Sequence, residues 1–407
     1  MNKKPEILAP AGDYDKLVAA VLYGADAVYL GGEEFSMRVA CSNFSDEDIK
    51  RGIDFAKSNG KKIYIATNVI MKNNDIEQLA RFAEKIYSYG ADAVILSDIG
   101  AFDVVKNAVP NLDIHISTQA NTNNYASANM WHKLGASRVV LSREMTYGEV
   151  KELRRKTDPN LELELFVHGA MCVSYSGRCL LSSFMTGREA NRGACTQPCR
   201  WKYYLMEEKR PGEYMPVFEN DNGSYFFNSK DLCLIEFIPE LVDSGVTSFK
   251  IEGRVKSEYY VANTVKAYRH ELDRYFENPD KYEFDKHWIE ELGKVSHRVY
   301  SYGFWHGAPA DDGQIYDSSA YIRDYEVVGV VKECDDDGNA VVMQKNKFSV
   351  GETIEVMQPL NENFEFELTE MTDEKGKQIE SAAHGKMLVN IKLPKKTDVN
   401  SMLRKQK

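Results

Sequence analysis

Between Glu6 and about Arg269, short apolar runs alternate with longer stretches in which apolar residues recur at helical spacing. Short runs bounded by turn residues predict buried strands, whereas the longer pattern predicts helices that pack one face on a sheet. Strands are expected at residues 6–9, 27–30, 62–67, 93–96, 113–117, 138–142, 162–167 and 248–252, and helices at 13–22, 46–57 and 75–87 among others. Eight strands, each followed by a helix, predict an α/β fold of the TIM type, a closed (β/α)8 barrel.

An internal repeat supports this count of strands. Related segments introduce the second, fourth, sixth and eighth strands: Gly24-Ala25-Asp26-Ala27-Val28, Gly90-Ala91-Asp92-Ala93-Val94, Gly135-Ala136-Ser137-Arg138-Val139 and Gly245-Val246-Thr247-Ser248-Phe249. A helix commonly ends on a left-handed glycine, after which the chain enters the next strand. A two-strand period repeated four times favours a closed barrel over an open sheet, although chance recurrence of common turn residues remains the alternative.

The hydrophobic pattern divides the chain into four parts. Residues 1–280 are expected to form the barrel, with a cysteine-rich insertion at 168–231 after the seventh strand, and residues 281–320 a connecting segment. Residues 321–394 show strand-like runs at 325–332, 339–345, 352–357, 363–369 and 386–393, which predict a small antiparallel β-barrel. Residues 395–407 are expected to be a basic tail. Loops that follow barrel strands lie at the face where active sites are built, so the insertion is expected to carry chemistry.

Composition and charge narrow the class of protein. The 407 residues include 43% hydrophobic and 28% charged residues, and the formal net charge is −11. No segment approaches the roughly 18–20 apolar residues of a membrane helix, and no secretory h-region follows the first residues, so a cytoplasmic protein without membrane contact is expected. The acidic balance argues against a wholly basic nucleic-acid-binding surface but is compatible with a local basic patch.

Five of the seven cysteines are clustered in the sequence. The spacing is Cys172-x6-Cys179-x15-Cys195-x3-Cys199, and Cys233 lies 34 positions further on. Disulfides are rare in a reducing compartment, so clustered thiols indicate metal binding or catalysis. Structural zinc sites usually pair ligands two to four residues apart, whereas irregular spacing is more typical of an iron–sulfur cluster. The spacing therefore favours a cluster, with zinc and redox or structural thiols as alternatives, and it supplies one thiol too many for four ligands.

Several motifs give the chain a resemblance to a known family. They are ELFVHGAMCVSYSGRCLLS at 164–182, NSKDL at 228–232, KIEGR at 250–254, LAPAG at 8–12 and KNKFSVG at 345–351. Together they resemble the collagenase-like peptidase family over essentially the whole chain. With Arg200-Trp201 directly after the last close cysteine pair, the chain resembles the subgroup of tRNA uridine hydroxylation proteins.

That resemblance implies an enzyme that converts wobble uridine to 5-hydroxyuridine in a prephenate-dependent, oxygen-independent reaction. It implies an iron–sulfur cofactor, expected to be 4Fe-4S, with tRNA and prephenate as partners. The cluster ligands would be Cys172, Cys179 and Cys195, with either Cys199 or Cys233 as the fourth. Hydroxylation of ribosomal RNA cytidine or of a quinone precursor is an alternative within the family. The oligomeric state is not indicated by the sequence.

A peptidase is the alternative from another class of enzyme. The sequence contains no His-Glu-x-x-His and no Gly-x-Ser-x-Gly segment, so two common protease arrangements are absent. A scattered catalytic triad remains open, but no motif marks one.

Candidate substrate-binding residues lie at strand ends and in the insertion. Prephenate carries two carboxylates, for which Arg38, Arg143 and Arg254 are the expected partners, with salt bridges to neighbouring glutamates as the alternative. Between Cys172 and Lys202, five basic residues accompany one acidic residue, so Arg178 and Arg200 are candidate RNA contacts; the alternative is that these arginines neutralise the thiolates. His168, expected as a hydrogen-bonding rim residue, and Glu252 are weak candidates for the catalytic acid or base.

Overall fold

The computed structural model describes residues 3–35, 43–172, 174–176, 178–190, 193–201, 204–205, 215–216, 228–307, 314–315 and 321–407. The predicted barrel is present. Its eight strands are β1 Glu6–Ala11, β2 Ala27–Leu30, β3 Lys62–Ala66, β4 Ala93–Leu96, β5 Asp113–Ile116, β6 Arg138–Val140, β7 Glu162–Ala170 and β12 Ser248–Ile251. Neighbouring strands pair in parallel in this order, and β12 pairs with both β7 and β1, which closes the barrel.

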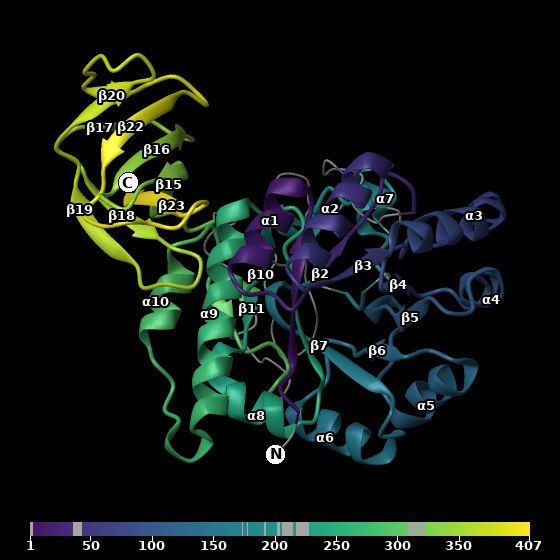
Figure 1. Cartoon of the computed structure of the whole chain (residues 1–407). Coiled ribbons are helices and arrows are strands. Elements are labelled where there is room, and N and C mark those ends of the chain that lie inside the picture. Colours follow the sequence, from purple (N-terminus) through teal and green to yellow (C-terminus); the bar gives the residue numbers. More distant parts are fainter. Residues whose placement is uncertain are drawn as a thin grey trace.

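Helices surround the barrel on the outside (Figure 1). They are α1 Tyr14–Leu22, α2 Asp46–Ser58, α3 Asn73–Tyr89, α4 Ile99–Ala108, α5 Tyr125–Leu134, α6 Tyr147–Lys156, α8 Ile238–Asp243 and α9 Glu258–Glu277. The repeated glycine has the role that the sequence predicts, since Gly90 ends α3 with a left-handed φ of 95°. Apolar side chains of strands and helices form one continuous core between the two layers, so the barrel is a rigid support for its loops.

The insertion between β7 and β12 carries short elements. These are α7 Leu181–Thr186, β8 Tyr204–Leu205, β9 Met215–Pro216, β10 Asn228–Ser229 and β11 Asp231–Cys233, with 3-10 turns at Pro198–Arg200 (η3) and Ile235–Phe237 (η4). Strand β7 is longer than predicted and extends to Ala170, because β11 pairs antiparallel with its last residues. Cys233 therefore lies opposite His168 in the sheet and belongs to the barrel wall.

The segment expected to be a simple connector contains α10 His287–Gly293, β13 Tyr300–Ser301 and β14 Gln314–Ile315. Strand β13 adds to the barrel sheet beside β11, and β14 pairs with β10. Two further 3-10 turns, η1 Thr118–Ala120 and η5 Pro279–Lys281, follow β5 and α9. Among the described residues, no helix is long and apolar enough to cross a bilayer.

The C-terminal part is a separate antiparallel β domain with its own apolar core. It comprises β15 Tyr325–Cys334, β16 Asn339–Gln344, β17 Phe348–Ser349, β18 Thr353–Met357, β19 Phe364–Glu367, β20 Met371–Asp373, β21 Ser381–Ala382, β22 Leu388–Lys392 and β23 Met402–Gln406. Seven of these strands form a curved sheet in the order β19-β18-β23-β15-β16-β22-β20. Figure 1 shows this sheet beside α9 and α10.

The expectation of a basic tail at 395–407 is wrong, because β23 pairs with both β15 and β18 inside the sheet. Arg404 is fully buried at the contact with the barrel domain, where its Nη2 lies 2.6 Å from Glu291 Oε2 and 2.5 Å from Glu355 Oε1. Its Nη1 also donates to the Tyr259 hydroxyl on α9 at 2.9 Å. The charge of Arg404 is therefore neutralised by buried carboxylates that join the two domains.

Candidate functional site

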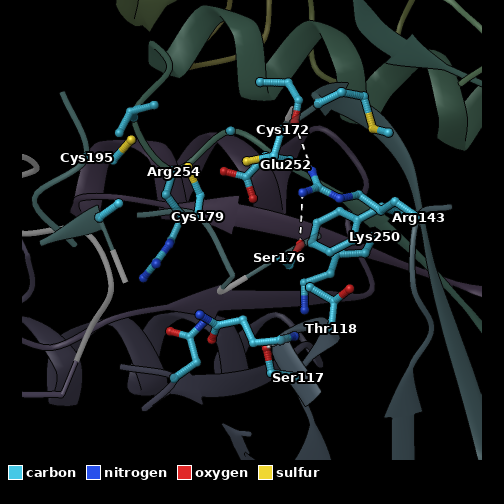
Figure 2. Close-up of a pocket in the computed structure, with 18 of the residues that line it drawn as sticks. Ser117, Thr118, Arg143, Cys172, Ser176, Cys179, Cys195, Lys250, Glu252 and Arg254 are labelled. Atoms are coloured by element: carbon cyan, nitrogen blue, oxygen red, sulfur yellow. Dashed lines mark hydrogen bonds between the residues drawn. The ribbon is translucent and has the colours of Figure 1, made fainter. Parts of the chain in front are cut away.

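A pocket with a volume of about 210 Å³ opens at the carboxyl ends of the barrel strands. Its wall combines strand-end residues with residues of the cysteine-rich insertion (Figure 2). The insertion contributes thiols and hydroxyls, and the barrel contributes cations, aromatic rings and amides. The lining residues used below are Tyr29, Arg143, Phe166, Cys172, Tyr175, Ser176, Cys179, Cys195, Cys199, Lys250, Glu252, Arg254, Lys256 and Tyr321.

Four of the five clustered cysteines line this one pocket: Cys172, Cys179, Cys195 and Cys199. Cys172 and Cys195 are exposed, and Cys179 and Cys199 are partly buried, with no disulfide among the cysteines described. Figure 2 shows Cys172, Cys179 and Cys195 on one side of the pocket and Arg143 and Lys250 on the other. Within the described part of the chain, no group of three or more Cys, His, Asp or Glu side chains is arranged to hold a metal ion. The donor set suits soft metal, but the thiols do not have the spacing of ligands around one centre.

The fifth cysteine is in a different environment. Cys233 is 2% exposed in the barrel core, and it is absent from the pocket lining. Burial raises the pKa of its thiol to about 12. The neighbouring Tyr268 hydroxyl donates to the Val167 carbonyl and accepts from the Leu234 amide, which ties the residue after Cys233 to β7. The geometry thus groups Cys199, and not Cys233, with the first three cysteines.

Arg143, expected as a substrate contact, is bonded to the loop that carries the first cysteine. Its Nη1 donates to the Ala170 carbonyl at 3.0 Å and its Nη2 to Ser176 Oγ at 2.9 Å, on either side of Cys172. The guanidinium also lies 5.4 Å from the centre of the Phe166 ring. Arg143 therefore fixes the position of this loop over the barrel, in addition to placing positive charge at the pocket.

Lys250 lies at the end of β12 and is a pocket cation that the sequence motif did not reveal. It is 4% exposed, and its Nζ lies 2.7 Å from Glu164 Oε1 and 4.5 Å from the centre of the Tyr29 ring. Glu164 is in turn bound by Arg138 at 2.9 Å, and these two partners lower the pKa of its carboxyl although burial opposes them. The only sequence signal for this role was the placement of Lys250 in KIEGR at a strand end. The buried carboxylate keeps a cation at the pocket wall.

Glu252 lies at the pocket, whereas His168 does not. The Tyr29 hydroxyl donates to Glu252 Oε2 at 3.4 Å. His168 is 1% exposed, and burial lowers its pKa to about 3. Its ring packs beside those of Tyr260 and Tyr300, and neither of its nitrogens makes a hydrogen bond to the described residues. The prediction that His168 lies at the rim of the pocket is therefore wrong. Strand β7 continues past His168 to Ala170, and the imidazole is buried beside the rings of Tyr260 and Tyr300.

The motif glycine after His168 has a steric role. Gly169 has a φ of 114°, and a Cβ atom there would lie 2.5 Å from the Glu252 carbonyl oxygen. Any larger residue would force β7 away from β12. The close approach of these two strands holds Glu252 beside the cysteine loop.

The remaining predicted arginines have different locations. Arg254 is 5% exposed and lines the pocket. Arg178 is exposed at the mouth, where its Nε donates to Asn121 Oδ1 at 3.4 Å. Arg38 and the side chain of Arg200 lie outside the described residues. Lys256, which sequence reasoning did not single out, adds a cation 4.4 Å from the centre of the Tyr321 ring.

These features define a (β/α)8-barrel protein whose mouth carries a pocket lined by four thiols and by several cations. The chain belongs to peptidase family U32. The model of that family matches residues 12–315, and the model of the U32 C-terminal domain matches residues 323–404.

Relatives extend over most or all of the chain. It is 38% identical to tRNA hydroxylation protein P1 of Bacillus subtilis over 408 residues, covering 100% of this chain and 96% of the relative. It is 36% identical to tRNA hydroxylation protein P of Escherichia coli over 440 residues, covering 98% and 96%. It is also 44% identical over 305 residues to a Methanocaldococcus jannaschii protein named uncharacterized protease MJ0090, covering 74% and 72%.

Proposed function

We propose that this protein is an iron–sulfur enzyme that hydroxylates the wobble uridine of tRNA at C5, giving 5-hydroxyuridine. The reaction would use prephenate and would not require molecular oxygen. Four cysteines that line one pocket at the barrel mouth are the observation that carries this proposal. The names of the full-length relatives from Bacillus subtilis and Escherichia coli support tRNA hydroxylation.

The donor set fits a four-iron cluster, because four thiolates suffice to hold one. Cys172, Cys179, Cys195 and Cys199 would be the ligands. When bound, the cluster would supply one-electron chemistry at the mouth of the pocket. Arg143 would hold the Cys172 loop in place through its bonds on either side of that cysteine.

The cations in the pocket wall support a small carboxylate as the second substrate. Arg254, Lys250 and Lys256 all line the pocket, and prephenate carries two carboxylates. Guanidinium groups bind carboxylates in a bidentate manner, and an ammonium that is held over aromatic rings is already desolvated. Lys250 and Arg254 would therefore orient the carboxylates, while Glu252 lies close enough to the pocket to exchange a proton with substrate.

Proteolysis is the competing function, since one relative is named a protease. Measuring the nucleosides of tRNA from a deletion strain separates the two. We expect 5-hydroxyuridine derivatives to disappear and to return with the wild-type gene but not with Cys172→Ala or Cys179→Ala. Unchanged 5-hydroxyuridine derivatives would contradict the proposal. Gelatin cleavage by the purified protein that survives both substitutions would favour a peptidase with a thiol-independent site.

A further inference from the structure

Helix α7 and its entry carry apolar side chains that face solvent. Phe184 is 83% exposed, Leu180 55% and Met185 47%. We call these three residues the α7 patch. Leu180 and Phe184 are four residues apart, so they lie on the same face of the helix. Trp201, 45% exposed, follows the 3-10 turn η3 that packs against α7, and Tyr175, 47% exposed, lines the pocket itself.

The orientation of α7 is the reverse of the usual arrangement. A surface helix normally turns its apolar side inward. Here Ser182 is fully buried, and its Oγ lies 3.0 Å from Thr196 Oγ1, while Thr186 Oγ1 lies 3.1 Å from the same atom. The Thr196 amide also donates to Ser182 Oγ at 3.1 Å. Hydrogen bonds of these hydroxyl groups thus hold the polar side of α7 on the segment that follows Cys195, so the apolar side faces solvent.

The charged residues around the α7 patch favour the binding of a polyanion. Arg178 and Arg188 are both exposed on either side of α7 in the sequence. The acidic residue beside them, Glu189, lies 3.4 Å from Lys72 Nζ, so its charge is offset. An apolar surface flanked by arginines suits unpaired nucleotides, whose bases stack on apolar and aromatic side chains while their phosphates meet cations.

We infer that the α7 patch is a stacking surface for the unpaired bases beside the target nucleotide in the loop of an RNA stem-loop. The inference rests on the proposed function, because it assumes that the base to be modified enters the adjoining pocket. Phe184 would stack on a neighbouring base, and Leu180 and Met185 would cover its edge. Arg178 and Arg188 would contact the phosphates of the same strand.

The test uses the full-length, iron-loaded protein and an anticodon stem-loop with 2-aminopurine next to the target uridine. Fluorescence quenching reports stacking, and anisotropy reports affinity. Phe184→Ala is expected to weaken binding about tenfold, which is about 1.4 kcal/mol, because it removes the ring on which a base would stack. It should also abolish the quenching. Phe184→Trp should retain both the affinity and the quenching. Phe184→Ala should change the binding of a fully paired duplex little.

Leu360→Ala is the matched control, since Leu360 is 67% exposed on the C-terminal domain and its truncation should leave stem-loop binding unchanged. Equal affinity and quenching for wild type and Phe184→Ala would overturn the inference while leaving the tRNA substrate intact. Loss of self-association in Phe184→Ala without loss of RNA binding would instead identify the patch as a protein interface. No binding of the stem-loop by wild type would contradict the proposed substrate together with the inference.

Discussion

Replacing Cys199 should lower the iron content of the protein, whereas replacing Cys233 should leave it unchanged. Cys199 lines the pocket with the other three cysteines, whereas Cys233 is 2% exposed in the barrel core. A metal ligand must be a thiolate. Burial raises the pKa of the Cys233 thiol from an ordinary value of 9.0 to about 12, so forming a thiolate there costs about 4 kcal/mol more than at an exposed cysteine. Recruiting it would also disrupt the pairing of β11 with β7.

Anaerobic purification followed by iron and sulfide analysis tests this prediction. Cys199→Ala is expected to lose most of its iron and its visible absorbance, as are Cys172→Ala and Cys195→Ala. Cys233→Ala should keep the iron of the wild type, with a modest loss of stability because it leaves a small cavity. Far-UV circular dichroism checks that each variant is folded. Full iron in Cys199→Ala together with iron loss in a folded Cys233→Ala would refute the reasoning.

Three other perturbations test the structure around the site. Arg143→Met should speed proteolytic cleavage within the cysteine insertion. It removes two charge-assisted hydrogen bonds, which contribute about 1.5–3 kcal/mol each. An unchanged cleavage rate would contradict the role of Arg143 in holding the loop. Arg404→Ala should lower the free energy of unfolding by about 3 kcal/mol or more, because it leaves unpaired carboxylates buried between the domains. Arg404→Lys should lower the free energy of unfolding by less. Equal denaturation curves for wild type and Arg404→Ala would contradict the importance of this contact. His168 has a folded pKa of about 3, below its unfolded value near 6.5, so stability should fall as pH drops through this window, by up to about 1.4 kcal/mol per unit from this group. His168→Phe should flatten that slope in denaturant titrations, and an identical slope would contradict the burial of a neutral imidazole.

The barrel could be predicted from the sequence because its strands are buried on both faces and read as apolar runs. Strands β2 and β4 have the predicted bounds, and the bounds of β3 and β5 differ by one residue. The predicted glycine repeat also ends helix α3 as expected. The local hydrophobic pattern is sufficient to predict such a fold, because each strand is followed by a helix.

Long-range pairing could not be predicted in this way. Strand β11 is three residues long, and only its pairing with the end of β7 places Cys233 and His168 in the core. Arg404 suggested a solvated tail because its buried partners, Glu291 and Glu355, lie far away in the sequence. Lys250 is likewise held at the pocket wall by its ion pair with Glu164, which lies 86 positions earlier in the sequence. Charged residues inside a fold depend on distant partners, which periodicity does not reveal.

The most direct test of the central claim is an anaerobic reaction with purified, iron-loaded protein, unmodified tRNA and prephenate, followed by mass spectrometry of the nucleosides. The proposed function predicts that the wobble uridine gains one oxygen atom with wild type. It predicts no product when prephenate is omitted or when Cys172→Ala replaces the wild type. Unmodified uridine under all of these conditions, with wild-type protein that carries its full iron, would contradict it.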